Sequence, residues 1–343
     1  MKVKLKDFDP NDLATNTDNI YGLPFTVEDA SLVILPVPWE VTVSYSSGTA
    51  DGPEAVFNAS FQVDLYDPFV KNAWRLGVAM ESVDKKLKSK SASLRKKAKK
   101  YIDTLASGKK PDEKIRKEIN AASKDLNAWV KKRSLKFMDQ KKTVGLLGGD
   151  HSTPFGLILA LAEKNKEFAV LQIDAHADLR VAFEGFDYSH ASIMYNILQV
   201  PQVKKLVQVG IRDYCQAELD IINSNKKVKT FFDRDIKHQQ FQGRSWSDIC
   251  DEIVSTLPDK VYLSIDIDGL DPKLCPNTGT PVPGGFEFEQ LLFLFEKLVK
   301  SKRKIIGFDL NEVSPGDNEW DANIGARLLY RVANLTLSSQ NQK

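Results

Sequence analysis

The chain of 343 residues has few cysteines and no long apolar run. Its three cysteines, Cys215, Cys250 and Cys275, are widely spaced and form no CxxC pair, which argues against a disulfide framework and against a thiolate metal site. No segment approaches the roughly 18 apolar residues of a membrane-spanning helix, and the amino terminus has no apolar signal-peptide core. The sequence therefore predicts a cytoplasmic protein with reduced thiols and no membrane partner.

Apolar side chains make up 42% of the chain, enough for a large core in one α/β domain or two smaller ones. Short apolar segments alternate with helical patterns. About eight of these segments are expected to be strands, at residues 32–37, 75–78, 143–147, 168–173, 205–209, 228–232, 261–267 and 304–308. Such alternation is typical of a parallel sheet covered by helices on both faces, with ligands bound beyond the carboxyl ends of the strands.

Residues 81–142 differ in composition from the rest of the chain. They contain 21 Lys or Arg and 8 Asp or Glu, a net charge of 21 − 8 = +13, so the remaining chain carries 2 − 13 = −11. Apolar residues recur at helical spacing on both sides of residues 108–111, which predicts a hairpin of two amphipathic helices. A basic surface can bind nucleic acid or a membrane, but few aromatic residues are interleaved for base stacking. We therefore favour a solvated lysine face on a helical insertion, and no nucleic-acid partner.

Two carboxylates, Asp266 and Asp268, end the apolar segment in VYLSIDIDGLDP. Side chains alternate between the two faces of a strand, so both are expected to project from the same face as Ser264. Neighbouring buried carboxylates repel each other unless cations or protons neutralise them. The sequence therefore predicts a positive partner at this strand end.

Two further strand ends carry aspartate and histidine. LQIDAHADLR places Asp174, His176 and Asp178 two residues apart, and GLLGGDHSTP brings Asp150 and His151 to the same edge through a Gly-Gly turn that is expected to bend sharply. Oxygen-rich sites with some imidazole suit Mn²⁺ or a similar first-row ion. Because these ligands exceed what one catalytic ion needs, two bridged ions are the better interpretation.

Six motifs in a fixed order resemble the ureohydrolases, the family of arginase, agmatinase, guanidinobutyrase and formimidoylglutamase. They are GGDHS, DAHAD, SHAS, SIDIDGLDP, GTPVPGG and NEVSP, within residues 45–315. The resemblance implies one three-layer α/β/α domain over residues 1–343, with residues 81–142 inserted in it. It also implies a binuclear manganese site, hydrolysis of a guanidinium or formimidoyl carbon–nitrogen bond, and a homo-oligomer, either a trimer or a hexamer.

The same resemblance assigns metal ligands. One ion would be held by His151, Asp174, Asp178 and Asp266, and the other by Asp174, His176, Asp266 and Asp268. Asp174 and Asp266 would then bridge the two ions, which lets a pair of cations activate water at neutral pH. Ni²⁺ is the alternative to Mn²⁺, because ligand softness does not separate the two sharply.

Catalytic roles also follow from the resemblance. Asp178 is expected to protonate the leaving nitrogen, and His190 in DYSHAS to carry protons to and from solvent as a group that titrates near neutrality. Glu312 in NEVSP is expected to accept hydrogen bonds from the guanidinium, and Thr280 in GTPVPGG to lie at the pocket wall. Asp150 is expected to orient neighbouring groups and to bind no metal.

The substrate is less well defined by the sequence. After DAHAD the chain reads LRVAFEGFDY, without an arginase-like clamp for an amino acid, so an agmatinase, a guanidino-acid hydrolase or a guanidine hydrolase is favoured over arginase. Arg180 would bind a substrate carboxylate, whereas Glu184 or Asp187 would meet a distal amine. Trp320 would lie at the pocket rim and stack on a small guanidinium.

Three other functions stay open at this point. A formimidoylglutamase would use the same centre to release formamide. A deacetylase-like amide hydrolase would need one ion, whereas this chain has ligands for two. A metal-binding scaffold without catalysis would use the basic hairpin as its docking surface.

Overall fold

The computed structural model describes residues 5, 8–13 and 16–341, so part of the amino terminus that was searched for a signal peptide, and both ends of the predicted 1–343 domain, lie outside the described residues. Its centre is a sheet of eight strands in the order β2-β1-β3-β8-β7-β4-β5-β6, and every neighbouring pair is parallel. The strands are β1 (Leu32–Val37), β2 (Val78–Met80), β3 (Thr143–Gly148), β4 (Phe168–Ile173), β5 (Val203–Ile211), β6 (Val228–Phe232), β7 (Lys260–Asp266) and β8 (Lys304–Asn311).

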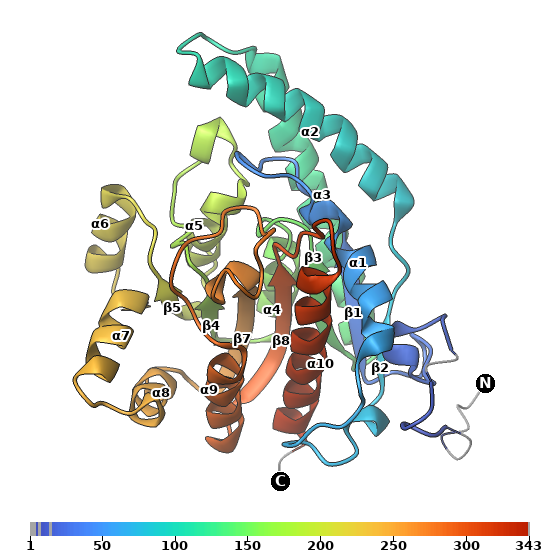
Figure 1. Cartoon of the computed structure of the whole chain (residues 1–343). Coiled ribbons are helices and arrows are strands. Elements are labelled where there is room, and N and C mark those ends of the chain that lie inside the picture. Colours follow the sequence, from blue (N-terminus) through green and yellow to red (C-terminus); the bar gives the residue numbers. More distant parts are fainter. Residues whose placement is uncertain (1–4, 6–7, 14–15, 342–343) are drawn as a thin grey trace.

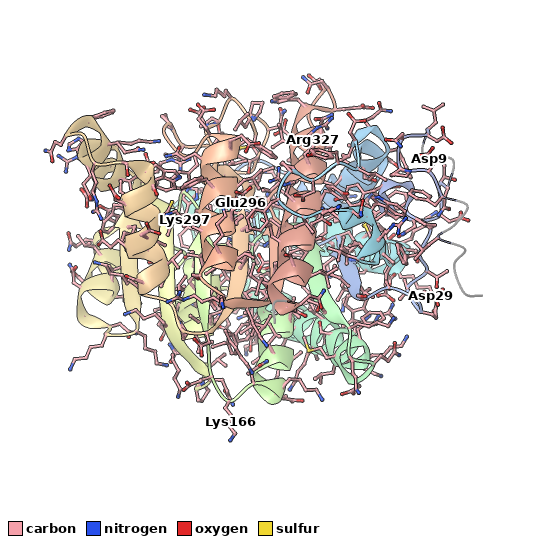
Figure 2. The ribbon with its side chains drawn as sticks, turned by 90° about the horizontal axis from the view of Figure 1, so that it is seen from below. Asp9, Asp29, Lys166, Glu296, Lys297 and Arg327 are labelled. Carbon is pink, nitrogen blue, oxygen red and sulfur yellow. The ribbon has the colours of Figure 1, made fainter. Side chains whose placement is uncertain are left out.

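Helices cover both faces of this sheet (Figure 1). One layer contains α1 (Gly52–Ala59), α8 (Trp246–Ser255), α9 (Phe288–Lys300) and α10 (Trp320–Gln340). The opposite layer contains α3 (Glu113–Asp139), α4 (Phe155–Lys164) and α5 (Ile193–Leu198). Seen from below, α9 with Glu296 and Lys297 lies beside α10 with Arg327, on the side of the sheet away from Lys166 (Figure 2). The predicted three-layer α/β/α fold is confirmed.

The middle of the sheet is apolar because its strands are buried on both faces. All six residues of β4 are buried, and so are all six of β1. Beyond β5, the sheet edge carries α6 (Gln216–Ser224) and α7 (Asp233–Phe241). Among the described residues, no helix is long and apolar enough to cross a membrane.

Strand bounds agree with the predicted ones to within one residue except in β2, β5 and β8, and β5 covers residues 203–211 where 205–209 was predicted. β2 lies at 78–80 and not at 75–78, because residues 73–75 form a 3₁₀ turn and Gly77 has a left-handed φ of 86°. β7 stops at Asp266, where a 3₁₀ turn over Ile267–Gly269 begins. β8 runs past the predicted end at residue 308 to Asn311, which pairs with Asp266.

The predicted helical hairpin is present as α2 (Lys85–Ala106) and α3, joined by a turn around Gly108. Asp84 and Asp112 cap the two helices. The side chain of Asp84 accepts two backbone N–H groups of the first turn, and that of Asp112 accepts one. The hairpin reaches above the carboxyl ends of the strands (Figure 1). That residues 81–142 are an insertion in the family domain stays a prediction.

Sheet order decides where the site forms. The four strands followed by the predicted ligands or by Glu312 are β3, β8, β7 and β4, and these are neighbours in the sheet. Their carboxyl ends therefore meet at one edge, although their sequences lie far apart along the chain.

Candidate metal centre and substrate pocket

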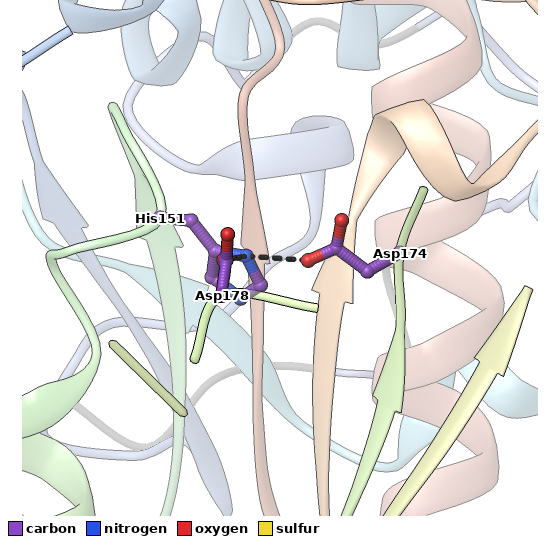
Figure 3. A group of neighbouring side chains, drawn as sticks. All are labelled: His151, Asp174 and Asp178. Carbon is purple, nitrogen blue, oxygen red and sulfur yellow. Dashed lines mark ion pairs between the residues drawn. The ribbon is translucent and has the colours of Figure 1, made fainter. Parts of the chain in front are cut away.

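A first group of side chains that could hold a metal ion gathers around the imidazole of His151 (Figure 3). His151 follows β3, and its Nδ1 lies 3.0 Å from Asp174 Oδ2, 3.2 Å from Asp178 Oδ2 and 3.3 Å from Asp266 Oδ2. All four residues are buried. Three strand ends thus direct one imidazole nitrogen and three carboxylate oxygens to one point.

A second group shares Asp174 with the first. It consists of Asp174, His176 and Asp268. His176 Nδ1 lies 3.0 Å from Asp268 Oδ2 and 3.6 Å from Asp174 Oδ1. The structure therefore brings together all six residues predicted as metal ligands, in two adjoining groups with Asp174 between them.

Local turns bring alternate residues to the same side after the strands end. Asp266 Oδ1 accepts a hydrogen bond from the backbone N–H of Asp268 (2.9 Å), and Asp174 Oδ1 accepts one from His176 N–H (2.6 Å). The predicted strand alternation is therefore wrong for Asp268, which reaches the site through a 3₁₀ turn. A carboxylate that hydrogen-bonds two residues ahead is a common turn in which aspartate competes with regular structure.

The chain bends after Gly148, at Gly149 and Asp150, as predicted, but a left-handed glycine conformation is not the cause. Neither glycine has a positive φ. An added Cβ at Gly149 would lie 2.1 Å from the carbonyl oxygen of Trp39, and one at Gly148 would lie 1.9 Å from Asn311 Oδ1. These positions require glycine because neighbouring segments approach closely, which lets β3 deliver His151 between β1 and β8.

The charges in this centre depend on one another. Burial alone would lower the pKa of His151, but Asp174, Asp178 and Asp266 raise it well above its ordinary value. The pKa of His176 rises to about 12 in the same way, against burial, mainly because of Asp268. Burial, with Asp174 close by, raises the pKa of Asp178 to about 7. The carboxylates therefore require positive charge among them, which protons on the histidines or cations can supply.

The donor set fits divalent metal ions. His151 Nδ1 is buried and has no hydrogen-bond partner, although three carboxylate oxygens surround it. One imidazole and three carboxylates around a common point form an oxygen-rich site of the kind that Mn²⁺ and similar ions occupy. The other ring nitrogen, His151 Nε2, lies 2.9 Å from Ser264 Oγ, which donates to Asp309 Oδ1 (3.1 Å). Such an outer hydrogen bond fixes the orientation of a ligating histidine.

A cavity of about 190 Å³ opens beside the centre. Glu312, Thr280 and His190 line it together with ligand candidates of both groups. Glu312 Oε1 accepts the backbone N–H of His151 (2.9 Å), and its Oε2 lies on the side of Gly279, where an added Cβ would come within 3.0 Å. Glu312 is buried and has a φ of 62°, a strained conformation for a residue other than glycine. Asp178 has a similar φ of 54°.

His190 opens onto this cavity from the loop between β4 and α5. Burial, together with the positive charge on His176 and His151, lowers its pKa to about 3. This differs from the expectation of a group that titrates near neutrality. Burial therefore disfavours the charged form of this ring.

The predicted substrate-tail residues separate into two sets. Arg180 lines the cavity, but its guanidinium lies 4.7 Å from the ring centroid of Phe183 and its Nε lies 3.7 Å from Glu218 Oε2. Glu184 and Asp187 do not line the cavity. Trp320 begins α10, and its indole N–H donates to the carbonyl oxygen of Lys273 (3.0 Å) away from the cavity.

Several residues at the mouth of the cavity were not predicted from the sequence. Asp213 and Tyr214 follow β5, and both line the cavity. Glu218 is buried, and its carboxylate accepts the N–H groups of Leu179 and Cys215. Their signal was a polar run at the carboxyl end of a predicted strand, the position that marks ligand sites in parallel sheets.

Known proteins resemble this chain in both sequence and fold. The family model described as "Arginase family" matches residues 30–334. The N(1)-aminopropylagmatine ureohydrolase of Thermus thermophilus is 32% identical over 308 residues, which cover 90% of this chain and 91% of that protein. The agmatinase of Pyrococcus horikoshii is 27% identical over 90% of this chain and 93% of its own length. The crystal structure of agmatine ureohydrolase of Thermoplasma volcanium has a TM-score of 0.72 at 23% identity and covers 94% of both chains, a likeness of fold.

Proposed function

Because this chain belongs to the arginase family, we propose that it is a ureohydrolase, an enzyme that hydrolyses a guanidino carbon–nitrogen bond and releases urea. The observation that carries the proposal is the pair of ligand groups that share Asp174, beside a buried glutamate that lines the same cavity. A guanidinium is planar and cationic, and a carboxylate with a free oxygen is a suitable acceptor for it.

His151, Asp174, Asp178 and Asp266 would hold one ion, and His176 and Asp268 would hold the other together with the shared carboxylates. Two divalent ions at this place would supply Lewis-acid charge for the attack of water on the guanidinium carbon. Mn²⁺ is the proposed metal and Ni²⁺ the alternative, because oxygen and imidazole ligands suit both.

Residues around the ions would orient the substrate and transfer protons. Glu312 orients the guanidinium with the oxygen that does not bind His151 N–H. Asp178, which lines the cavity and belongs to the first ligand group, would pass a proton to the leaving nitrogen. His190, whose ring lines the cavity, would carry protons between the site and solvent, as the family resemblance implies.

The cavity mouth favours a substrate with a cationic tail. The nearby Glu218 compensates the charge of Arg180. The side chain of Asp213, in contrast, is 67% exposed, and its Oδ2 lies 3.9 Å from His176 Nε2. A distal ammonium group at Asp213 would gain an ion pair, and a carboxylate there would be repelled. We therefore favour a guanidino amine over a guanidino acid, as do the names of the two relatives above.

The experiment is a product assay on protein loaded with Mn²⁺, and in parallel with Ni²⁺. Agmatine, aminopropylagmatine, arginine, 4-guanidinobutyrate, guanidine and formimidoylglutamate would be tested for urea, ammonia and formamide. Urea from a guanidino amine is the expected result. Formamide from formimidoylglutamate alone would move the chain to the formimidoyl branch, and no product from any compound would favour the scaffold function.

Two further parts of the proposal concern assembly and location. One is a homo-oligomer, either a trimer or a hexamer, which the family resemblance implies. A cytoplasmic location, by contrast, was predicted from the sequence, and three free cysteines agree with it. Sedimentation measurements on the purified chain would decide the oligomeric state.

A further inference from the structure

The lysine-rich hairpin of α2 and α3 touches two loops that border the cavity (Figure 1). Its first partner is the loop between β1 and α1, over residues 40–50. Ser91 of α2 accepts the backbone N–H of Glu40 (3.0 Å), and Arg95 Nε donates to Ser47 Oγ (3.3 Å). The carboxylate of Glu40 in turn accepts the backbone N–H groups of Gly48 and Ala50, so α2 holds a loop that is already closed on itself.

The second partner is the loop over residues 182–190, between β4 and α5. One side chain of α3 spans it, because Asn120 Nδ2 donates to the carbonyl oxygen of Gly185 (3.2 Å) and Asn120 Oδ1 accepts the N–H of Asp187 (3.0 Å). Tyr101 of α2 packs on Phe186 with ring centroids 5.3 Å apart. The hairpin thus binds the backbone and one buried ring of this loop.

This loop contains strained backbone. Ala182 has a φ of 45° and Glu184 a φ of 56°, both left-handed conformations that residues other than glycine rarely adopt. Such conformations persist only where the surroundings impose them. Gly185 has a φ of 84°, and an added Cβ there would lie 2.7 Å from Arg116 Cδ of α3. The contacts from α3 therefore select one conformation of the loop.

The two loops meet at His190. Its backbone N–H donates to Thr42 Oγ1 of the first loop (3.4 Å), and its ring lines the cavity. Asp187, which Asn120 holds, lies three residues earlier in the same loop. The position of His190 is therefore set from both sides by segments that the hairpin binds.

Several lysines of the hairpin, in contrast, form ion pairs close by. Lys97 pairs with Glu118 of α3, Lys99 with Asp103 of its own helix, and Lys88 with Asp51 and Glu54. The polar side chains that face the body of the protein contact the cavity loops instead. The specific hydrogen bonds of the hairpin among the described residues thus include several to the loops that border the cavity.

We propose that the hairpin braces the two cavity loops and that Asn120 is a positioning residue for His190. Asn120 is suited to this role because one amide supplies both a donor and an acceptor, and so fixes a carbonyl group and an N–H group two residues apart. The inference rests on the proposed function only in so far as His190 serves turnover. The placement of His190 is testable without any substrate.

The first test measures the chemical accessibility of His190. Diethyl pyrocarbonate modifies histidine, and peptide mass analysis would give the rate at His190 relative to the exposed His238 of α7. We expect Asn120→Ala to raise this ratio by roughly fivefold, the factor that loss of an ordinary hydrogen bond represents. Lys117→Ala, an exposed change on the same helix, serves as the matched control and should leave the ratio unchanged. An unchanged ratio in folded Asn120→Ala protein would overturn the proposal.

The second test is a kinetic cycle with His190→Asn. If Asn120 acts through His190, Asn120→Ala lowers kcat in the unaltered chain but has no further effect in the His190→Asn background. Equal losses in both backgrounds would show a general structural effect and refute positioning. Asn120→Asp keeps the acceptor for Asp187 N–H and loses the donor, so an intermediate effect is expected. If the unaltered chain shows no turnover, the proposed function fails, and the modification ratio alone decides on the placement of His190.

Discussion

Asp174 belongs to both ligand groups, and its replacement gives the sharpest test of the metal centre. Asp174→Asn keeps the size of the side chain but removes the charge that both groups share. We expect it to abolish the binding of both ions. Asp268→Asn changes only the second group and should reduce the stoichiometry from two to one.

The magnitude follows from linkage between binding and folding. A ligand present at 100 times its Kd stabilises the folded chain by about 2.7 kcal/mol, so two such ions contribute about 5 kcal/mol. Unfolding entropy of about 2.1 cal/mol/K per residue gives roughly 0.7 kcal/mol/K for a chain of 343 residues. The expected rise in Tm on adding Mn²⁺ is therefore about 7 °C, halved in Asp268→Asn and nearly absent in Asp174→Asn.

Calorimetry with and without Mn²⁺ would measure these shifts, each against the same variant after chelation. Asp271→Asn is the matched control, because Asp271 lies close to Asp268 in the chain but its carboxylate accepts the N–H of Lys273 and belongs to neither group. A full Tm shift and two bound ions in Asp174→Asn would show that the centre was assigned wrongly.

Three further outcomes are expected. Glu312→Gln should lower kcat/KM by about a hundredfold, since a buried charged acceptor is lost, while calorimetric titration still finds two ions; normal turnover would remove Glu312 from substrate binding. Asp213→Asn should raise KM for agmatine by about threefold and leave KM for guanidine unchanged, because an exposed ion pair contributes little; equal changes for both substrates would contradict a role in tail recognition. The pKa of His176 is raised to about 12, so its stabilising contribution is complete below the unfolded pKa near 6.5 and is lost as pH rises. Chelated protein should therefore lose stability between pH 7 and pH 9 at about 1.4 kcal/mol per pH unit for this group, and a denaturant series that shows no loss would contradict a protonated His176.

Local patterns predicted most of the fold. Continuous apolar segments such as residues 168–173 became buried strands with the expected ends. The prediction failed at residues 304–308, because Asp309 and Asn311 are polar and yet lie buried within β8. Their side chains accept hydrogen bonds from other segments: Asp309 from Ser264 and Asn311 from Thr153. The periodicity of the strand itself does not indicate these partners.

The mouth of the cavity was predicted less well than the metal ligands. Ligand candidates occur in dense local motifs, so their chemistry is visible in short stretches. Asp213 and Glu218 each appear in an ordinary polar context and gain their place only when β5 lies next to β4. Trp320 was placed at the rim because it follows NEVSP in the chain, but the turn that leads into α10 carries it away from the cavity.

The strands, the hairpin helices and the kind of chemistry are readable from local sequence, because hydrophobic period and residue type act over a few neighbouring residues. The tertiary structure decided which strand ends meet, that Asp174 joins two ligand groups, and that the basic hairpin holds the loops around His190. These features depend on contacts between segments far apart in the chain, such as Asn120 with Asp187 and His151 with Asp266. Only the packed sheet and its covering layers bring such segments within hydrogen-bond distance.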